Sequence, residues 1–318
     1  MKRLATKQCT IAEALSFTGI GVHNGLPSSL IIQPAAVDSG YSICRKFEDG
    51  RLSEAFPLVH DRVARTYLCT AVDLGDAGTI SMIEHVVSAL SGLGIDNALL
   101  VVDGPECPVL DGSAAHYVQA IIETGLVVQP AEKKFIKIKR SILVRSNDAF
   151  AALEPYNGRA FDVEIDFEND VIGRQRMIFD WTPAKYASDV STARTFGFLR
   201  DAKILRQAGY ALGSSLENSI AVDDDKIMNS GELRFEDEFV RHKLLDAVGD
   251  LALAGMPIYG KFRSYKGGHG LNALVLNGLF ASEQNYEIVN AENLPLEFDA
   301  LEDMPLGLSS QGYIRSVG

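Results

Sequence analysis

The clearest pattern of hydrophobic and polar positions runs from Glu238 to Asp250 and predicts a buried helix. His242, Asp246 and Asp250 recur every four residues, so on a helix they form one row, each turned about 40° from the last. Apolar residues lie beside and opposite this row: Phe239, Leu253, Val240, Leu244, Val248 and Leu251. A helix that is apolar nearly all round is typical of a protein interior, where a polar row needs partners.

The pattern alone leaves two interpretations of this polar row open. Histidine nitrogen and aspartate oxygen are ordinary zinc donors, and side chains one helical turn apart can reach a single ion. Charged residues at this spacing more commonly form a solvated stripe on a surface helix. The surrounding apolar residues weaken the solvated stripe without excluding it, so a metal site or a buried polar network is a hypothesis here.

The chain before this helix alternates strand-like runs with turn signals. Residues 16–35 contain Asn24-Gly25, a dipeptide typical of β-hairpins. Apolar residues at helical spacing then predict a helix over Ser81–Leu93. The other elements predicted in this half are strands at 41–47, 67–73 and 98–102 and a loop with a second helix over 109–125.

A second half follows residues 129–134, QPAEKK, whose composition is typical of a linker. Its predicted elements are strands at 134–144 and 160–167, the buried helix, and a strand at 258–262. Both halves thus contain several strands, a buried helix, a Gly-containing segment that ends the helix, and another strand. We therefore predict an α+β fold of two similar domains, 1–128 and 135–290, and a loosely attached tail at 291–318. Coincidence is the alternative, because helix–turn–strand units are common.

Composition and charge limit the classes of function. The chain has 318 residues, 47% of them hydrophobic and 23% charged, which is typical of a folded protein of two domains. The formal net charge of −12 argues against a surface for nucleic acid or for an anionic membrane. An anionic ligand would therefore need locally placed Lys or Arg side chains.

The lack of a recognisable targeting signal and the cysteine usage both predict a cytoplasmic protein. The first residues lack the apolar stretch of a signal peptide, and no apolar run is long enough for a transmembrane segment. The four cysteines are scattered without a C-x-x-C motif, so neither a thiolate metal site nor a disulfide framework is expected. A metal site would have to use carboxylates and some of the six histidines.

A second candidate site is the pair Glu84 and His85 in the first half. Adjacent helical residues point about 100° apart, so both cannot comfortably bind one ion, but Glu84 could face a water on a metal held by His85. Small residues on the His85 side leave room for another element: Ser81, Ser88, Ala89 and Gly92. The structural alternatives are a capping box between Ser81 and Glu84 and a hydrogen-bonded core histidine.

Longer motifs cover almost the whole chain in order. E-H-x4-L-x-G-L-G-I-D-N begins at Glu84, and E-F-V-R-H-K-x2-D-A-x-G-D begins at Glu238. The others are GIGVHNG near the N-terminus, LDGSA at 110–114, STARTFGF at 191–198 and YKGGHGLN at 265–272. Together they resemble the UDP-3-O-acyl-N-acetylglucosamine deacetylase family, zinc amidases of lipid A synthesis in Gram-negative bacteria. The resemblance implies two α+β domains, each a helix layer against a sheet, with the active site between them.

The resemblance also implies a metal site and a catalytic base. His85, His242 and Asp246 resemble the three zinc ligands, and three protein ligands leave a fourth position for water, as in catalytic zinc sites. Glu84 resembles the general base that takes a proton from this water as it attacks the acetamide carbonyl. The implied reaction is hydrolysis of the N-acetyl group of an acylated UDP-sugar, with zinc, or iron(II) in the cell, as the cofactor.

Other positions resemble residues that complete the reaction. His269 resembles the imidazolium that stabilises the oxyanion or protonates the departing amine, and Asp250 resembles its carboxylate partner. Thr195 resembles a hydroxyl donor to the oxyanion, and Phe196 resembles a neighbouring wall of the site. These roles are implied by the resemblance alone.

Substrate-binding residues are implied in the same way. Lys243 and Lys266 resemble the contacts to the anionic nucleotide and the sugar hydroxyls. The segment 199–221 resembles the insert that forms the passage for the acyl chain, and its implied lining residues are Leu199, Ala202, Ala211 and Ser215. Small side chains there would leave volume for an alkyl chain, although helix packing also explains them. His23, within GIGVHNG, receives no definite role.

Two other functions are weighed against this one. A zinc deacetylase of another N-acetylated sugar nucleotide would gain nothing from an apolar passage. A non-catalytic relative that binds an acylated nucleotide sugar would not need Glu84 together with three metal ligands. We further expect a monomer that does not bind nucleic acid.

Overall fold

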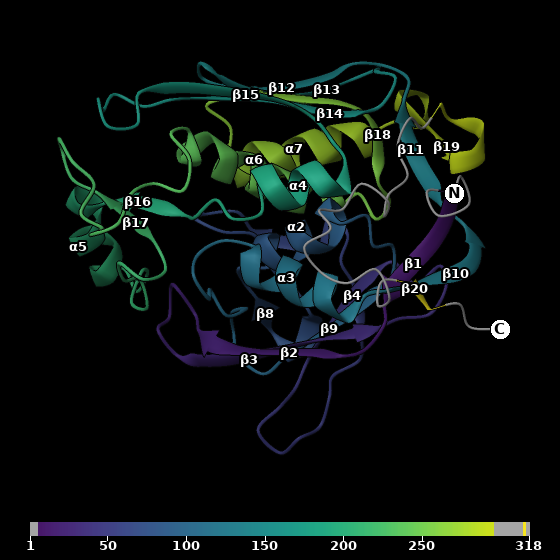
Figure 1. Ribbon diagram of the computed structural model, residues 1–318, viewed down its shortest axis with the longest axis horizontal. Coiled ribbons are helices and arrows are strands. Elements are labelled where there is room, and N and C mark those ends of the chain that lie inside the picture. The colour runs from purple at the N-terminus through teal and green to yellow at the C-terminus, as the bar shows by residue number, and fades with distance from the viewer. Residues whose placement is uncertain (1–5, 296–313, 316–318) are drawn as a thin grey trace.

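The computed structural model describes residues 6–295 and 314–315, and it confirms the predicted α+β class. Two sheets enclose two layers of helices (Figure 1). One helix layer holds α2 (Glu84–Gly92) and α3 (Ala115–Thr124), and the other holds α4 (Pro183–Asp189), α6 (Glu238–Ala252) and α7 (His269–Phe280). None of the helices in the described ranges combines the length and apolar character that crossing a membrane requires.

The sheet of the first half lies under α2 and α3 (Figure 1). Its strand order is β2-β3-β9-β4-β5, antiparallel except where β4 runs parallel to β9. Its strands are β2 (Leu15–Ile20), β3 (Pro27–Pro34), β4 (Tyr41–Arg45), β5 (Phe56–Pro57) and β9 (Ala98–Val102). A smaller sheet contains β6 (Val63–Arg65), β7 (Ala71–Asp73) and β8 (Thr79–Ile80).

The sheet of the second half covers α6 and α7 (Figure 1). Its central strand β18 (Ile258–Tyr265) pairs with β13, β11 and β14, and β15 pairs with β14. The other strands are β11 (Lys134–Ile138), β12 (Ile142–Ser146), β13 (Ala149–Glu154), β14 (Arg159–Asp166), β15 (Arg174–Asp180) and β19 (Tyr286–Asn290).

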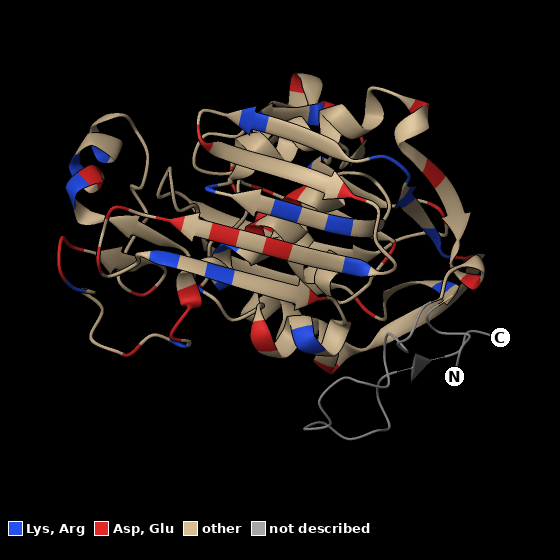
Figure 2. Cartoon of the chain, turned by 90° about the horizontal axis from the view of Figure 1, so that it is seen from above, with Lys and Arg blue, Asp and Glu red and all other residues tan. Residues whose placement is uncertain are grey.

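Side-chain alternation decides which face of this sheet is buried. Phe161, Val163 and Ile165 of β14 belong to the core, because successive strand residues point to opposite faces. Rows of acidic and basic residues run along these strands (Figure 2), and Asp162 and Glu164 alternate with the core residues of β14, so their side chains point to the opposite face. Asp162 there pairs with Arg176 of β15 at 2.7 Å. The sheet therefore presents one charged face to solvent and packs the other against α6 and α7.

Helices α2 and α6 join the two halves through small residues. The Ser88 hydroxyl donates to the Leu245 carbonyl at 2.7 Å, and a methyl group built on Gly249 would lie 2.1 Å from the Glu84 carbonyl oxygen. Gly92 similarly leaves room for the ring of Tyr186. The predicted small face of α2 is thus the face on which other helices pack.

Replacing Gly249 with alanine is expected to destabilise the protein by about 1–3 kcal/mol, because the added methyl group must push two buried helices apart. Urea unfolding of the two proteins measures this difference. Gly270→Ala in α7 is the matched control, since the nearest atom to its new methyl group is 3.6 Å away. Equal unfolding free energies for Gly249→Ala and the native protein would contradict this account of the helix contact.

Most predicted elements are confirmed with shifted bounds. The predicted strand at 134–144 is wrong, because this segment forms two strands, β11 and β12, with β13 and β18 between them in the sheet. The linker prediction is also wrong. The hairpin forms between β2 and β3, with Gly25 in the left-handed region at φ 69°. Residues 129–132 lie in β10 (Leu126–Glu132), Lys134 begins β11, and only Lys133 lies between them; β10 pairs with β1 (Lys7–Ile11). Composition indicated a loop, but pairing with a strand more than 100 residues away determines the structure here.

The predicted tail is only partly described. Ala291 is buried and donates its N–H to the Lys133 carbonyl at 2.9 Å, and the backbone of β20 (Ile314–Arg315) pairs with β10. These described parts of the tail are therefore attached to the fold. Residues 296–313 and 316–318 lie outside the described residues.

Candidate active site

Helices α2 and α6 bring the two predicted polar clusters together in the interior. Glu84 and His85 lie in the first turn of α2, and His242 and Asp246 lie on α6, each at most 4% exposed. The Nε2 atoms of His85 and His242 are 3.7 Å and 3.4 Å from Oδ1 of Asp246. One donor atom from each of these three residues lies within 4.8 Å of the other two, so together they could hold a metal ion.

The chemistry of these donors fits a divalent cation. Oδ1 of Asp246 is buried with no hydrogen-bond partner among the described residues, an arrangement that is costly unless another group satisfies it. Nδ1 of His242 lies 3.1 Å from the Ala193 carbonyl, which assigns the proton to Nδ1 and the lone pair to Nε2. Burial lowers the pKa of His242 to about 3, so its imidazole is neutral at physiological pH.

Asp246 remains ionised in this buried position. Burial raises the pKa of its carboxyl, but the neighbouring His242 and Lys243 outweigh this effect and hold the pKa well below its usual range. The Lys243 ammonium donates to Oδ2 of Asp246 at 2.8 Å, leaving Oδ1 facing the two imidazoles. A carboxylate with one oxygen free of hydrogen bonds, facing two imidazoles, is a suitable donor set for a metal.

Glu84 lies beside the three donors and does not cap the helix. Its Oε2 accepts the N–H of Thr70 at 3.1 Å, and its Oε1 is 3.9 Å from Nε2 of His269. The N-cap of α2 is Ile83, with no side-chain cap, and the Ser81 hydroxyl accepts a hydrogen bond from Arg65. The capping-box alternative is therefore wrong. Burial raises the pKa of Glu84, as suits a group that accepts a proton.

His269 is the first residue of α7. Its imidazole faces the same site through Nε2 and contacts the Asp250 carboxylate through Nδ1. Its Nδ1 lies 2.8 Å from Oδ2 of Asp250, whose oxygens also accept from Thr70 at 2.6 Å and Asn272 at 2.8 Å. Burial lowers the pKa of His269, but the negative charge and hydrogen bond of Asp250 outweigh this effect and raise the pKa to about 9. The imidazole is therefore charged at neutral pH.

Phe196 and Lys243 also lie at the cluster. The ring of Phe196, the first residue of β16 (Phe196–Phe198), is centred 6.3 Å from the ring of His242. The Lys243 ammonium lies 5.6 Å from the centre of the Phe196 ring. Thr195 directly precedes Phe196, and its N–H donates to the Gly112 carbonyl at 2.8 Å. Lys266 instead begins the loop between β18 and α7, where its ammonium pairs with Asp148 at 2.8 Å.

The insert forms a small unit beside β16. β17 (Ile220–Val222) pairs parallel with β16, and α5 (Leu199–Gln207) connects to it. Of the predicted lining residues, Leu199 and Ser215 are exposed and Ala202 and Ala211 are half-buried. The same unit exposes three further large apolar side chains: Ile204, Leu212 and Leu216.

His23 connects the insert to the hairpin of the first half. Its carbonyl accepts the N–H of Leu212 at 2.9 Å, and its ring packs against Tyr210 with centres 5.6 Å apart. Burial lowers the pKa of His23 to about 4. His23 is therefore a neutral, buried contact between the insert and the β2–β3 loop.

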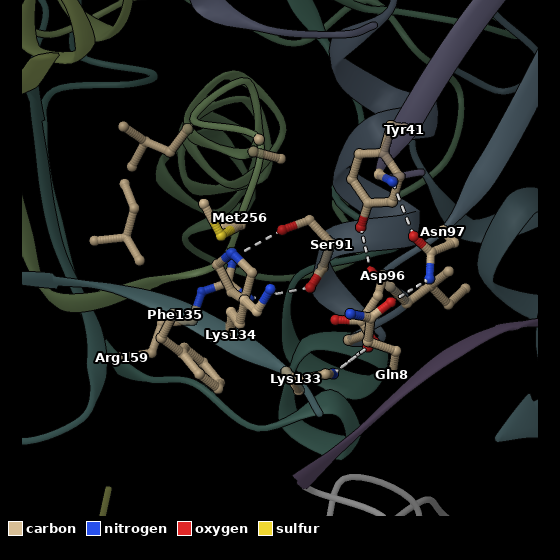
Figure 3. Close-up of a pocket in the computed structure, with 18 of the residues that line it drawn as sticks. Gln8, Tyr41, Ser91, Asp96, Asn97, Lys133, Lys134, Phe135, Arg159 and Met256 are labelled. Atoms are coloured by element: carbon tan, nitrogen blue, oxygen red, sulfur yellow. Dashed lines mark hydrogen bonds and ion pairs between the residues drawn. The ribbon is translucent and has the colours of Figure 1, made fainter. Parts of the chain in front are cut away.

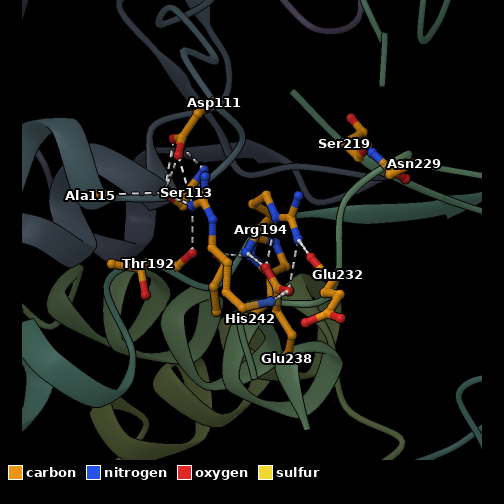
Figure 4. A network of polar contacts seen from close by, with 12 residues as sticks. Asp111, Ser113, Ala115, Thr192, Arg194, Ser219, Asn229, Glu232, Glu238 and His242 are labelled. Carbon is orange, nitrogen blue, oxygen red and sulfur yellow. Dashed lines mark hydrogen bonds and ion pairs between the residues drawn. The ribbon is translucent and has the colours of Figure 1, made fainter. Parts of the chain in front are cut away.

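Ion pairs that the sequence did not indicate hold the segment before Phe196 (Figure 4). Arg194 donates to both carboxylate oxygens of Glu238, at 2.8 Å and 3.0 Å, and Glu238 is buried at the start of α6. Arg234 bridges Asp111 and the Thr192 carbonyl, each at 2.8 Å. Arg194 and Asp111 lie within the STARTFGF and LDGSA motifs, which was the available signal.

A mixed α+β fold that buries two histidines and an aspartate beside a glutamate and a charged imidazole provides the donors and the acid–base groups that a metal-dependent hydrolase requires. The sequence model of the UDP-3-O-acyl N-acetylglycosamine deacetylase family matches residues 8–281. UDP-3-O-acyl-N-acetylglucosamine deacetylases of Brucella ovis, Brucella canis and Brucella melitensis are each 43% identical to this chain over 287 residues, 89% of this chain and 99% of theirs. The chain belongs to the UDP-3-O-acyl-N-acetylglucosamine deacetylase family.

Proposed function

We propose that this protein hydrolyses the N-acetyl group of UDP-3-O-acyl-N-acetylglucosamine, giving UDP-3-O-acyl-glucosamine and acetate, the committed step of lipid A biosynthesis. Membership of the family and the names of the relatives support this substrate. The observation that carries the reaction class is the convergence of two imidazoles and a carboxylate, from both halves, beside Glu84 and His269.

We assign zinc to His85, His242 and Asp246. Two imidazoles and one carboxylate form a common catalytic zinc donor set and leave a fourth position open. When bound, zinc lowers the pKa of a water molecule and polarises an amide carbonyl. Iron(II) suits the same donors, so metal analysis of protein purified from cells decides between the two.

The protein's own side chains provide the proton transfers. The Glu84 carboxylate takes a proton from the water whose oxygen attacks the acetyl carbon. His269, charged and held by Asp250, donates a proton from Nε2 to the amine nitrogen as the C–N bond breaks. The Thr195 hydroxyl donates to the oxyanion of the tetrahedral intermediate. Acetate leaves, and a free 2-amino group remains on the sugar.

Substrate recognition uses local positive charge and an apolar passage. We assign Lys243 and Lys266 to the anionic nucleotide and the sugar hydroxyls. We assign Leu199, Ala202, Ala211 and Ser215 to the passage for the acyl chain. The exposed apolar side chains of the insert, which adjoins Phe196 and hence His242, support a passage on this unit.

The proposal extends to a monomer in the cytoplasm with domains at 1–128 and 135–290. The five central side chains come from one chain, so the proposed site needs no residue of a second copy. The four cysteines are free and buried, as is typical of a reducing compartment.

The direct test is to incubate purified protein with UDP-3-O-acyl-N-acetylglucosamine and measure acetate release with and without a chelator. We expect release that the chelator abolishes and added zinc restores. The same assay with UDP-N-acetylglucosamine, which lacks the acyl chain, tests the alternative deacetylase. Equal turnover of both substrates would favour that alternative, and binding without acetate release would favour a non-catalytic protein.

The pH dependence of kcat/KM is expected to be bell-shaped, with Glu84 setting the acidic limb and His269 contributing to the basic limb near pH 9. His269 must be charged, so activity falls as pH rises through its pKa. Asp250→Asn removes the charge that raises this pKa but keeps an oxygen as acceptor for Nδ1. The basic limb should therefore move to lower pH. An unmoved limb in Asp250→Asn would remove Asp250 from the mechanism.

A further inference from the structure

A cavity of about 500 Å³ lies between the two halves, and its lining contains none of the side chains assigned to the metal or to the reaction (Figure 3). Ser91 at the end of α2 contributes to its wall, whereas Glu84 and His85 at the start of α2 face the metal site. Much of the wall is apolar, including Leu58, Ile95, Phe161, Leu251, Met256 and Ile258. Protein interiors are close-packed, and a hollow of this size and character is typical of small-molecule sites.

The charged side chains that line the cavity leave one cation unbalanced. Lys133 pairs with Asp96 at 3.1 Å, and Lys134 lies 4.0 Å from Asp38. Arg159, only 8% exposed, has no ion pair with a carboxylate among residues 6–295. The cavity therefore carries a local surplus of one positive charge, within a chain whose net charge is −12.

Neutral groups fix the position of the Arg159 guanidinium but do not balance its charge. It donates to the carbonyl of Ser91 at 3.1 Å and to its hydroxyl at 2.7 Å, and it stacks over the Trp181 ring at 4.5 Å. The end of α2 provides only about half a negative charge. Burial lowers the pKa of Arg159 to about 10, so the group is still charged at neutral pH. A buried cation without a counter-charge is costly, which favours an anionic ligand.

We propose that this cavity binds an apolar carboxylic acid, with its carboxylate at Arg159 and its hydrocarbon body against the apolar wall. A single negative charge matches the single unbalanced cation, whereas a phosphate monoester would bring nearly two. A planar carboxylate also matches the guanidinium in shape. This site is separate from the deacetylase site and does not depend on the proposed function.

Trp181 provides a direct test, because it is the only tryptophan of the chain and it lines the cavity. Full-length protein is titrated with decanoate below its micelle concentration while tryptophan fluorescence is recorded. We expect a saturable change with a Kd on the order of 0.1–1 mM. Decanol, which has the same chain without the charge, should bind at least about tenfold more weakly. No fluorescence change, or equal affinities for the two compounds, would overturn the proposal.

Two variants test whether decanoate binds in this cavity. Arg159→Met keeps an unbranched apolar stem and removes the guanidinium with its charge, so affinity for decanoate should fall at least about tenfold and become similar to that for decanol. Ala252→Leu enlarges a buried lining residue at the end of α6 and should weaken both ligands even if Arg159→Met does not fold. Ala281→Leu, an exposed residue outside the cavity, is the matched control and should bind like the native protein. Unchanged decanoate binding in Ala252→Leu would place the ligand elsewhere and refute the assignment.

Discussion

Replacing either His85 or His242 with alanine is expected to leave purified protein with well below one equivalent of zinc. In the proposed site each histidine is one of three donors, and the two come from helices in opposite halves of the chain. Loss of one imidazole removes a metal bond and opens the buried site to water. Without the ion, Oδ1 of Asp246 would be left buried with no hydrogen-bond partner among the described residues. Metal analysis by mass spectrometry after dialysis measures the occupancy directly.

His60→Ala is the control for this pair. His60 packs its ring against Phe280 with centres 4.4 Å apart and lies outside the donor cluster, so this variant should keep full occupancy. Full zinc in both His85→Ala and His242→Ala would refute the metal site. Loss of zinc in His60→Ala as well would indicate a general effect of destabilisation.

The sequence predicted the helices of this site better than the contacts between them. The apolar surroundings of His242 and Asp246 on α6 indicated a buried polar row, because helix periodicity is a local property that the chain displays directly. The pattern could not show that His85 of α2 faces this row. That contact joins positions more than 150 residues apart and was expected only from the resemblance to a known family.

The hydrogen-bond partners of Glu84 and Asp250 could not be predicted for the same reason. The N–H of Thr70 donates to Glu84 and its hydroxyl donates to Asp250, although no local pattern marks Thr70 as special. Residues 129–134 failed as a linker because composition reports flexibility and exposure, while the pairing of β10 with β1 depends on the whole fold. The motifs therefore indicated the candidate site residues. The tertiary structure was needed to find the hydrogen bonds and strand pairings that hold these residues in place.

Glu84→Gln is expected to lower kcat by on the order of 10²-fold or more while the protein keeps its zinc and its thermal stability. Gln has nearly the size of Glu and can still accept the N–H of Thr70, so the local structure should persist. It cannot take a proton from the attacking water. KM should change little, because the lost interaction belongs to the transition state. Steady-state kinetics, metal analysis and a melting curve on the same preparation measure all three quantities.

The matched control is Glu106→Gln, which makes the same substitution at another buried glutamate. Glu106 accepts the N–H groups of His23 and Asn24 and is not among the metal donors, so this variant should lose some stability but keep kcat within a few-fold. Near-normal turnover by Glu84→Gln would mean that Glu84 only accepts the Thr70 N–H and that another group takes the proton. A loss of zinc together with activity would instead mean that Glu84 supports the metal site, because the proton-transfer role requires activity to fall while the metal stays bound.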